Sequence, residues 1–204
     1  MIYEFRTYTL QVRTMPEFLK RFGEALPRRQ QLSPLAACWV TEFGPLNQVI
    51  HVWAYKDTNE RARIRAEAVK TGVWPPKVAE FITDMKSEIL EPLPFSPLLE
   101  PSDHGPYFEM RRYVLRAGGV PEMAAKWERH LAPRLELSPL IGVFTSDIGG
   151  LNQWVHIWAY KSLQQRMDVR RAMQETGVWP PPPPVPTLTQ DAWLMLPAPF
   201  SPIR

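Results

Sequence analysis

A duplicated segment is the feature that most constrains what this chain can fold into. Residues 46–56 read LNQVIHVWAYK, and residues 151–161 read LNQWVHIWAYK. The offset of 105 positions between these segments also aligns residues 4–95 with residues 109–200 without a gap. The chain is therefore expected to contain two copies of one structural unit.

We assign residues 1–100 to the first unit and residues 106–204 to the second, each the size of a small domain. In the first unit, alternation of apolar and polar residues predicts strands at residues 2–10, 35–43, 47–56 and 88–93. Apolar spacing and capping residues predict helices beginning near Met15 and Asn59, with a further helical piece at residues 77–86.

The resulting order, β-α-β-β-α-β, is that of a ferredoxin-like unit in the α+β class. A sheet with both helices on one side leaves its other side uncovered. We therefore expect the two units to pack sheet to sheet, as a pseudo-dimer within one chain that forms a dimeric α+β barrel. Association of the whole chain into a homo-oligomer is left open.

Strand alternation divides the repeated side chains into two sets. Ile50, Val52 and Ala54 are small aliphatic residues, and we expect them to pack under the helices. The other set is polar and aromatic, and we expect it to point into the space between the sheets. Its members are Glu4, Arg6, Tyr8, Asn47, His51, Trp53 and Tyr55, with the counterparts Glu109, Arg111, Tyr113, Asn152, His156, Trp158 and Tyr160.

This polar and aromatic set has two interpretations. It forms either a fixed network, in which Glu4 and Arg6 neutralise each other, or a pocket for a small-molecule ligand. In the pocket, Arg6 and Arg111 would orient an anionic or carbonyl group, and the tryptophans would line the walls. His51 and His156 are the candidate catalytic acid–base residues, because an imidazole titrates near neutral pH.

Several function classes are disfavoured. Cys38 is the only cysteine and lies in an apolar run, where a buried filler is expected rather than a nucleophile. No metal site or cofactor is implied, since phosphate loops, dinucleotide fingerprints and zinc motifs are missing. A net charge of +3 with interspersed acids disfavours nucleic-acid binding. Without a membrane span or a secretory signal, a cytoplasmic protein is expected.

Three further features recur or diverge between the units. Arg61 and Arg65 recur as Arg166 and Arg170. Their repetition suggests acidic partners, in Glu60, Glu67 or the other half, but we prefer a solvated basic flank. The loop at residues 71–76 (TGVWPP) recurs at 176–181, where its tryptophan is expected to plug one end of the barrel. The proline run at residues 182–186 has no proline-rich counterpart and is expected to form an extended spacer rather than a docking site.

The segment from Thr41 to Tyr55, the following Arg61 and Arg65, and the opening Tyr3–Leu10 resemble the NIPSNAP family. The second copy departs at residues 147–150 and in its proline run. The resemblance implies a dimeric α+β-barrel fold. The wider barrel superfamily includes cofactor-free monooxygenases, haem-degrading enzymes and isomerases, and animal NIPSNAP members are associated with mitochondria and vesicle-related roles. The resemblance transfers no catalytic residue.

The leading hypothesis is a ligand-binding barrel, with cofactor-free enzymatic activity left open. The rival is a non-enzymatic interaction or scaffold protein, suggested by the repeated Trp-Pro-Pro loop and the proline run. The rival predicts exposed aromatic loops, whereas the leading hypothesis predicts a cavity lined by the repeated polar residues.

Overall fold

The computed structural model describes residues 1–177, 179–182 and 184–204. The repeated loop of the second unit and the proline run include Val178 and Pro183, so the expectations for these two positions lie outside the described residues. Across the described residues, no helix is both long and apolar enough to cross a membrane.

Each half of the chain has the order β-α-β-β-α-β. The first half contains β1 (Ile2–Leu10), α1 (Met15–Gln30), β2 (Leu35–Phe43), β3 (Gln48–Tyr55), α2 (Thr58–Lys70) and β4 (Ile82–Pro92). The second half contains β5 (Tyr107–Leu115), α3 (Gly119–Leu135), β6 (Leu140–Ile148), β7 (Gln153–Tyr160), α4 (Leu163–Thr176) and β8 (Thr187–Pro197). The predicted ferredoxin-like order is thus present twice.

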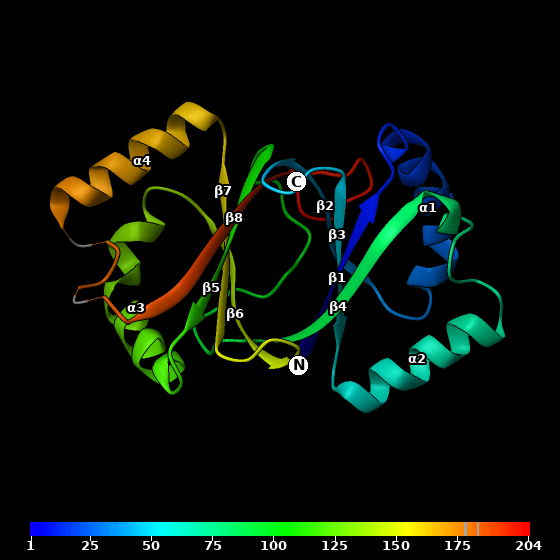
Figure 1. The fold of residues 1–204 in the computed structure, drawn as a ribbon, viewed down its shortest axis with the longest axis horizontal. Coiled ribbons are helices and arrows are strands. Elements are labelled where there is room, and N and C mark those ends of the chain that lie inside the picture. The colour runs from blue at the N-terminus through cyan, green and yellow to red at the C-terminus, as the bar shows by residue number, and fades with distance from the viewer. Residues whose placement is uncertain (178, 183) are drawn as a thin grey trace.

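The strands form one closed barrel in the order β1-β3-β2-β8-β5-β7-β6-β4. Two antiparallel contacts between the halves close it: β4 pairs with β6, and β2 pairs with β8. Figure 1 shows the two sheets face to face, with α1 and α2 outside one sheet and α3 and α4 outside the other. Closure leaves no unpaired sheet edge between the halves, and it confirms the intrachain dimeric α+β barrel.

The prediction of a helical segment at residues 77–86 is wrong. Only a short 3-10 turn forms there, at Ala79–Phe81, and β4 begins directly after it at Ile82. The early part of β4 pairs with β1, with Asp84 opposite Thr9 and Met85 opposite Tyr8. Pairing along β1 satisfies the backbone groups of these residues, which outweighs their helical propensity.

The interior of the barrel is apolar. Tyr3, Phe5 and Trp39 of the first half share one buried cluster with Phe108 and Phe144 of the second. The rings of Phe5 and Phe144 lie 5.3 Å apart, and those of Trp39 and Phe108 lie 5.6 Å apart. The halves therefore bury their aromatic side chains in a single core.

The predicted orientation of the two side-chain sets is consequently reversed. Ile50 and Val52 lie in the barrel core rather than under the helices. Tyr8 and Trp53 pack instead with Phe18 and Phe22 of α1. The alternation along the strands was predicted correctly, but its two faces were exchanged. A closed interior excludes water from every side, so charged groups are tolerated better on the helix side, where the layers have open edges.

Candidate functional site

Each half contains a cavity between its sheet and its helices. The first cavity has a volume of about 680 Å³ and the second about 300 Å³. Eleven positions line both of them at the same offset in sequence, and seven of these carry the same arginine, tyrosine or tryptophan. In the first cavity they are Arg6, Tyr8, Arg29, Trp53, Tyr55, Arg65 and Trp74, and in the second they are Arg111, Tyr113, Arg134, Trp158, Tyr160, Arg170 and Trp179. Most of the predicted site residues are therefore brought together, but outside the barrel.

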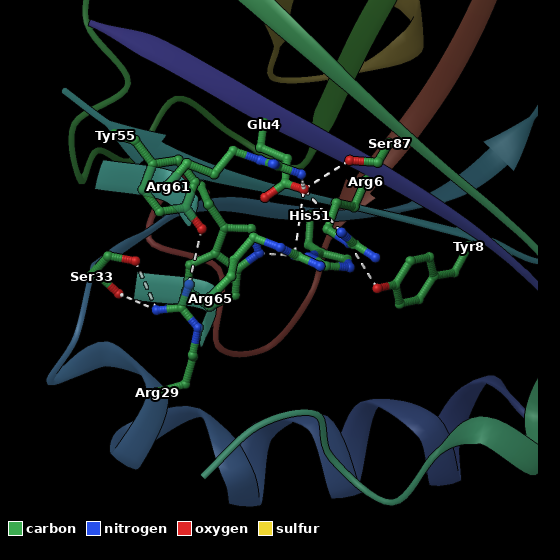
Figure 2. Close-up of polar contacts among 11 residues, drawn as sticks. Glu4, Arg6, Tyr8, Arg29, Ser33, His51, Tyr55, Arg61, Arg65 and Ser87 are labelled. Atoms are coloured by element: carbon green, nitrogen blue, oxygen red, sulfur yellow. Dashed lines mark hydrogen bonds and ion pairs between the residues drawn. The ribbon is translucent and has the colours of Figure 1, made fainter. Parts of the chain in front are cut away.

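Glu4 organises the polar side of the first cavity. Its Oε1 atom accepts hydrogen bonds from Arg61 at 2.6 Å, Ser87 at 2.7 Å and Arg6 at 2.9 Å. Arg65 lies 3.5 Å from the same oxygen, and the Glu4 side chain is fully buried. Figure 2 shows these groups converging on one carboxylate. The predicted Glu4–Arg6 pair is present, within a larger network that joins β1, β4 and α2.

This network determines the charge of Glu4. Burial alone would raise the pKa of its carboxyl group, but the hydrogen bonds from Arg61 and Ser87 and the charge of Arg6 lower that pKa to about 2. Glu4 is therefore ionised at neutral pH. In the second half, Glu109 binds Arg166 at 2.6 Å and Arg111 at 3.2 Å, and these arginines likewise lower its pKa against the effect of burial.

The expectation of a solvated basic flank at Arg61 and Arg65 is wrong. Arg61 is paired with Glu4, and the equivalent Arg166 is paired with Glu109. The charged ends of both arginines turn from α2 and α4 toward the sheet because a buried carboxylate lies there. Arg65 and Arg170 are more exposed, at 39% and 41% of their side chains, and they line the cavities.

Arg29 is a site residue that the sequence reasoning missed. It lies in α1 and is 2% exposed. Its guanidinium donates to the Tyr55 hydroxyl at 3.0 Å and to the Ser33 hydroxyl at 2.7 Å, and it lies 4.2 Å from the ring centre of Trp53. Within the described chain, no carboxylate forms an ion pair with Arg29. The sequence held one signal for this residue: Arg29 recurs as Arg134, and a serine follows four residues later in both halves, as Ser33 and Ser138.

Arg134 has the same surroundings in the second half. It donates to the Ser138 hydroxyl at 2.6 Å and to the Tyr160 hydroxyl at 3.0 Å, and lies 3.8 Å from the ring centre of Trp158. Burial lowers the pKa of both guanidinium groups from their ordinary value, yet an arginine stays protonated in proteins. Each cavity therefore contains a buried positive charge held by neutral groups.

His51 is fully buried beside the first cavity. Its Nδ1 atom accepts a hydrogen bond from the Trp53 indole at 2.8 Å, so the proton of the neutral ring resides on Nε2. Burial, reinforced by the charge of Arg6, lowers its pKa to about 3. His156 repeats this arrangement with Trp158 at 2.8 Å, and burial lowers its pKa well below the ordinary value. Both rings are neutral at physiological pH.

The Nε2 atoms of both histidines are buried and have no hydrogen-bond partner among the described residues. Around His51 the nearest rings are those of Tyr8, 4.7 Å away, and Phe22, 5.1 Å away, each edge to face. His156 also lines the second cavity. The acid–base role of these histidines stays a prediction. The Nδ1 lone pair of each ring is occupied by a tryptophan indole and the pKa is lowered, so each ring is a weak base whose Nε2–H can donate a hydrogen bond.

Asn47 and Asn152 lie outside the cavities, contrary to their predicted place. Both precede a strand, at β3 and β7, with positive φ values of 57° and 56°. Their carbonyl groups accept the N–H groups of Leu10 and Leu115, at 2.8 and 2.9 Å. Asparagine tolerates this left-handed conformation better than most residues, which gives both residues a structural role in a turn.

Trp74 packs under a helix rather than at the end of the barrel. Its ring lies 4.9 Å from that of Phe22 in α1 and 5.6 Å from that of Trp53 in β3, both edge to face. Trp179 makes equivalent contacts with Trp127 at 4.6 Å and Trp158 at 5.9 Å. These tryptophans form cavity walls and are half-buried, whereas the interaction hypothesis expects exposed rings.

Cysteine chemistry and metal binding receive no support from the described residues. Cys38 is fully buried in the core, and burial raises the pKa of its thiol. Nowhere in residues 1–177, 179–182 and 184–204 do three or more His, Cys, Asp or Glu side chains form a group that could hold a metal ion. The cavities combine arginine, tyrosine and tryptophan, which is a donor set for an anion with an apolar body.

Similar folds occur in proteins with little sequence identity. An anthrone oxidase-like protein of known crystal structure aligns over 96% of this chain and 90% of its own, with a TM-score of 0.60 and 10% identity. At this identity the match shows a shared fold only.

Sequence comparison identifies the family, whereas the structural match shows only the fold. A NipSnap homolog from Dictyostelium discoideum is 30% identical over 182 residues, covering 87% of this chain and 78% of that protein. NipSnap homolog 3A of Homo sapiens is 29% identical, covering all of this chain and 86% of that protein. The NIPSNAP family model matches twice, at residues 3–97 and 108–202. The matches cover nearly the whole chain, and each coincides with one β-α-β-β-α-β unit. The chain therefore belongs to the NIPSNAP family.

Proposed function

We propose that the protein binds small organic anions in the cavity between sheet and helices of each half. The observation that carries this proposal is the buried arginine, Arg29 or Arg134, which lines each cavity without a carboxylate partner in the described chain. A buried charge is costly unless it is paired. A carboxylate, sulfonate or phosphate group on a ligand would supply the missing charge.

The charge balance around the first cavity supports an anionic ligand. Arg6, Arg29 and Arg65 line it, and Glu4 is the carboxylate shared by Arg6, Arg65 and the neighbouring Arg61. One negative charge is thus set against four positive ones. Arginine suits this role because its planar fork binds oxyanions through two parallel hydrogen bonds.

The walls of the cavity support an apolar or aromatic body for the ligand. Trp53, Trp74 and Tyr55 surround the space next to Arg29. Aromatic side chains bind rings and flat apolar groups through stacked or edge-to-face contacts. A pocket that is mostly apolar with a few convergent charges is typical of a small-molecule site.

We propose neutral hydrogen-bond donors, rather than general bases, as the roles of His51 and His156. Each has a protonated, buried Nε2 that finds no hydrogen-bond partner among the described residues. His156, which lines its cavity, would donate to a carbonyl or oxyanion of the ligand. This arrangement is compatible with binding alone and with cofactor-free chemistry on the bound anion.

Titration calorimetry with biphenyl-4-carboxylate tests the proposal, and the neutral biphenyl-4-carboxamide is the matched ligand control. We expect the carboxylate to bind and the amide to bind at least tenfold more weakly, since a charge-assisted hydrogen bond contributes about 1.5–3 kcal/mol. Combining Arg29→Met with Arg134→Met should abolish the preference for the carboxylate.

A second pair of variants separates the cavity from general surface charge. Arg65 and Arg63 both lie in α2, but only Arg65 lines the first cavity, while Arg63 is exposed. Both substitutions are made in the Arg134→Met protein, in which only the first cavity keeps its buried arginine. Relative to that protein, Arg65→Met should weaken the binding of biphenyl-4-carboxylate several-fold, and Arg63→Met should leave it unchanged. Equal binding of the carboxylate and the amide, or binding that survives loss of both buried arginines, contradicts the proposal.

A further inference from the structure

The two cavities share the groups that would recognise an anion. In the first, Arg6, Arg29 and Arg65 converge from β1, α1 and α2. Their counterparts in the second also line the space. Because the tyrosines and tryptophans that support these arginines are repeated as well, both cavities are expected to bind the same kind of charged group.

The cavities differ in the groups that would meet the rest of the ligand. Ala68, a buried residue of α2, is replaced in α4 by Met173, whose longer side chain lines the second cavity. Met85 near the start of β4 is replaced in β8 by Gln190, and Val69 of α2 is replaced in α4 by Gln174. The change at Ala68 removes space, and the changes at Met85 and Val69 substitute a polar wall for an apolar one.

The volumes agree with these substitutions. The first cavity encloses about 680 Å³ and the second about 300 Å³. The second also extends to His156 and Glu109, whereas His51 and Glu4 do not line the first. A ligand in the second cavity would therefore be smaller and would meet more polar side chains.

We infer that the two cavities select different ligands within one chemical class: the first takes bulky aryl or similarly apolar anions, and the second takes small anions that carry a further polar group. This inference rests on the proposed function. It identifies Ala68/Met173, Val69/Gln174 and Met85/Gln190 as the position pairs that determine specificity, while the arginines provide the affinity common to both cavities.

The test isolates one cavity at a time in the chain that contains both halves. The Arg134→Met protein retains the first cavity and the Arg29→Met protein retains the second. Biphenyl-4-carboxylate and salicylate are the probes, because they share a carboxylate but differ in size and polarity. The measurement is calorimetric affinity, with circular dichroism as the check that each variant is folded.

We expect the protein with only the first cavity to prefer biphenyl-4-carboxylate by at least tenfold, and the protein with only the second to prefer salicylate. Adding Met173→Ala to the latter should raise its affinity for biphenyl-4-carboxylate at least tenfold. Adding Ala68→Met to the former should lower it. Because Ala68 is buried and the larger side chain threatens folding, Met85→Gln at the half-exposed Met85 is a second variant with the same expected direction.

Identical preferences in the two single-cavity proteins, unchanged by the exchanges, would overturn the inference and leave the proposed function intact. Failure of the proposed function gives a different result, in which neither protein binds either probe or the protein lacking both arginines binds as well as the parent.

Discussion

At the scale of single residues, the buried carboxylates explain how several arginines come to lie close together. Arg6, Arg61 and Arg65 would repel one another without a shared counter-charge. Glu4 supplies that charge through Oε1, which accepts a hydrogen bond from each arginine and from Ser87. The carboxylate positions the arginines and neutralises only part of their charge, which leaves a net positive charge beside the cavity.

Replacing Glu4 with glutamine should lower the free energy of unfolding by about 3 kcal/mol, because it leaves buried arginine charge without its partner. Urea denaturation followed by tryptophan fluorescence measures the change. Glu17→Gln is the matched control, since Glu17 forms an exposed pair with Arg21 in α1 and such pairs contribute less than about 1 kcal/mol. Equal losses in the two variants would refute a special role for Glu4.

The two buried histidines predict a dependence of stability on pH. Folding lowers the pKa of His51 from 6.5 to about 3, and it also lowers that of His156. Below pH 6.5 the two histidines therefore bind protons in the unfolded chain but stay unprotonated in the folded chain. Stability that is complete above pH 6.5 should fall as the pH drops, by up to about 1.4 kcal/mol per pH unit for each histidine.

Urea unfolding measured from pH 7.5 to pH 4.5 checks this slope. His51→Gln should reduce the slope by about half, because His156 continues to contribute. Below about pH 4.5 the unfolded chain also binds a proton at Glu4, whose pKa in the folded chain is about 2, and this adds a further loss of stability. A stability that stays constant between pH 6.5 and pH 4.5 would rule out the neutral buried imidazoles.

At the scale of secondary-structure elements, α2 and α4 carry the outer arginines and depend on caps for their orientation. Asp57 precedes α2, and its side chain accepts the N–H of Glu60 at 2.8 Å. Ser162 precedes α4 and accepts the N–H of Gln165 at 3.0 Å. Few residues of α2 are buried, namely Ile64 and Ala68, so its first turn relies on the cap.

Asp57→Ala should therefore lower the free energy of unfolding by about 1 kcal/mol. Thermal and urea unfolding provide the measurement. Thr14→Ala is the control, because Thr14 precedes α1 without making a side-chain cap hydrogen bond. A cost at Thr14 equal to that at Asp57 would show that the Asp57 cap is not the origin of the effect.

The elements were largely predictable from the sequence, because strand alternation and helix caps are local signals. The start of β4 was not, since residues 82–86 become a strand only through pairing with β1, far away in the chain. Most of the site residues were also predictable from their repetition. Which side of the sheet they face was not, because alternation defines two faces without saying which of them meets the other half.

At the scale of the whole molecule, the halves share one core and are expected to unfold together. Phe5 contacts Phe144 across the barrel, and Trp39 contacts Phe108. The β4–β6 and β2–β8 pairings bind the same halves at the sheet edges. Neither half therefore possesses a core that is complete without the other.

Phe5→Ala and Phe108→Ala should each lower the free energy of unfolding by about 3–5 kcal/mol, as expected for a large ring removed from a packed core. Each variant should still unfold in a single transition, with circular dichroism and tryptophan fluorescence coinciding. Two separate transitions, of which a variant shifts only one, would show that the halves are independent. Val12→Ala, at an exposed position between β1 and α1, serves as the control.

Residues 93–106 join the end of β4 to the start of β5 and so tie both halves into one polypeptide. In an assembly of two identical chains, symmetry would repeat every substitution at both sites. Here one mutation alters one site and spares its counterpart. Closure of the barrel is also intramolecular, so dilution does not open it. Covalent joining thus frees the two cavities from symmetry and exposes each of them to selection on its own.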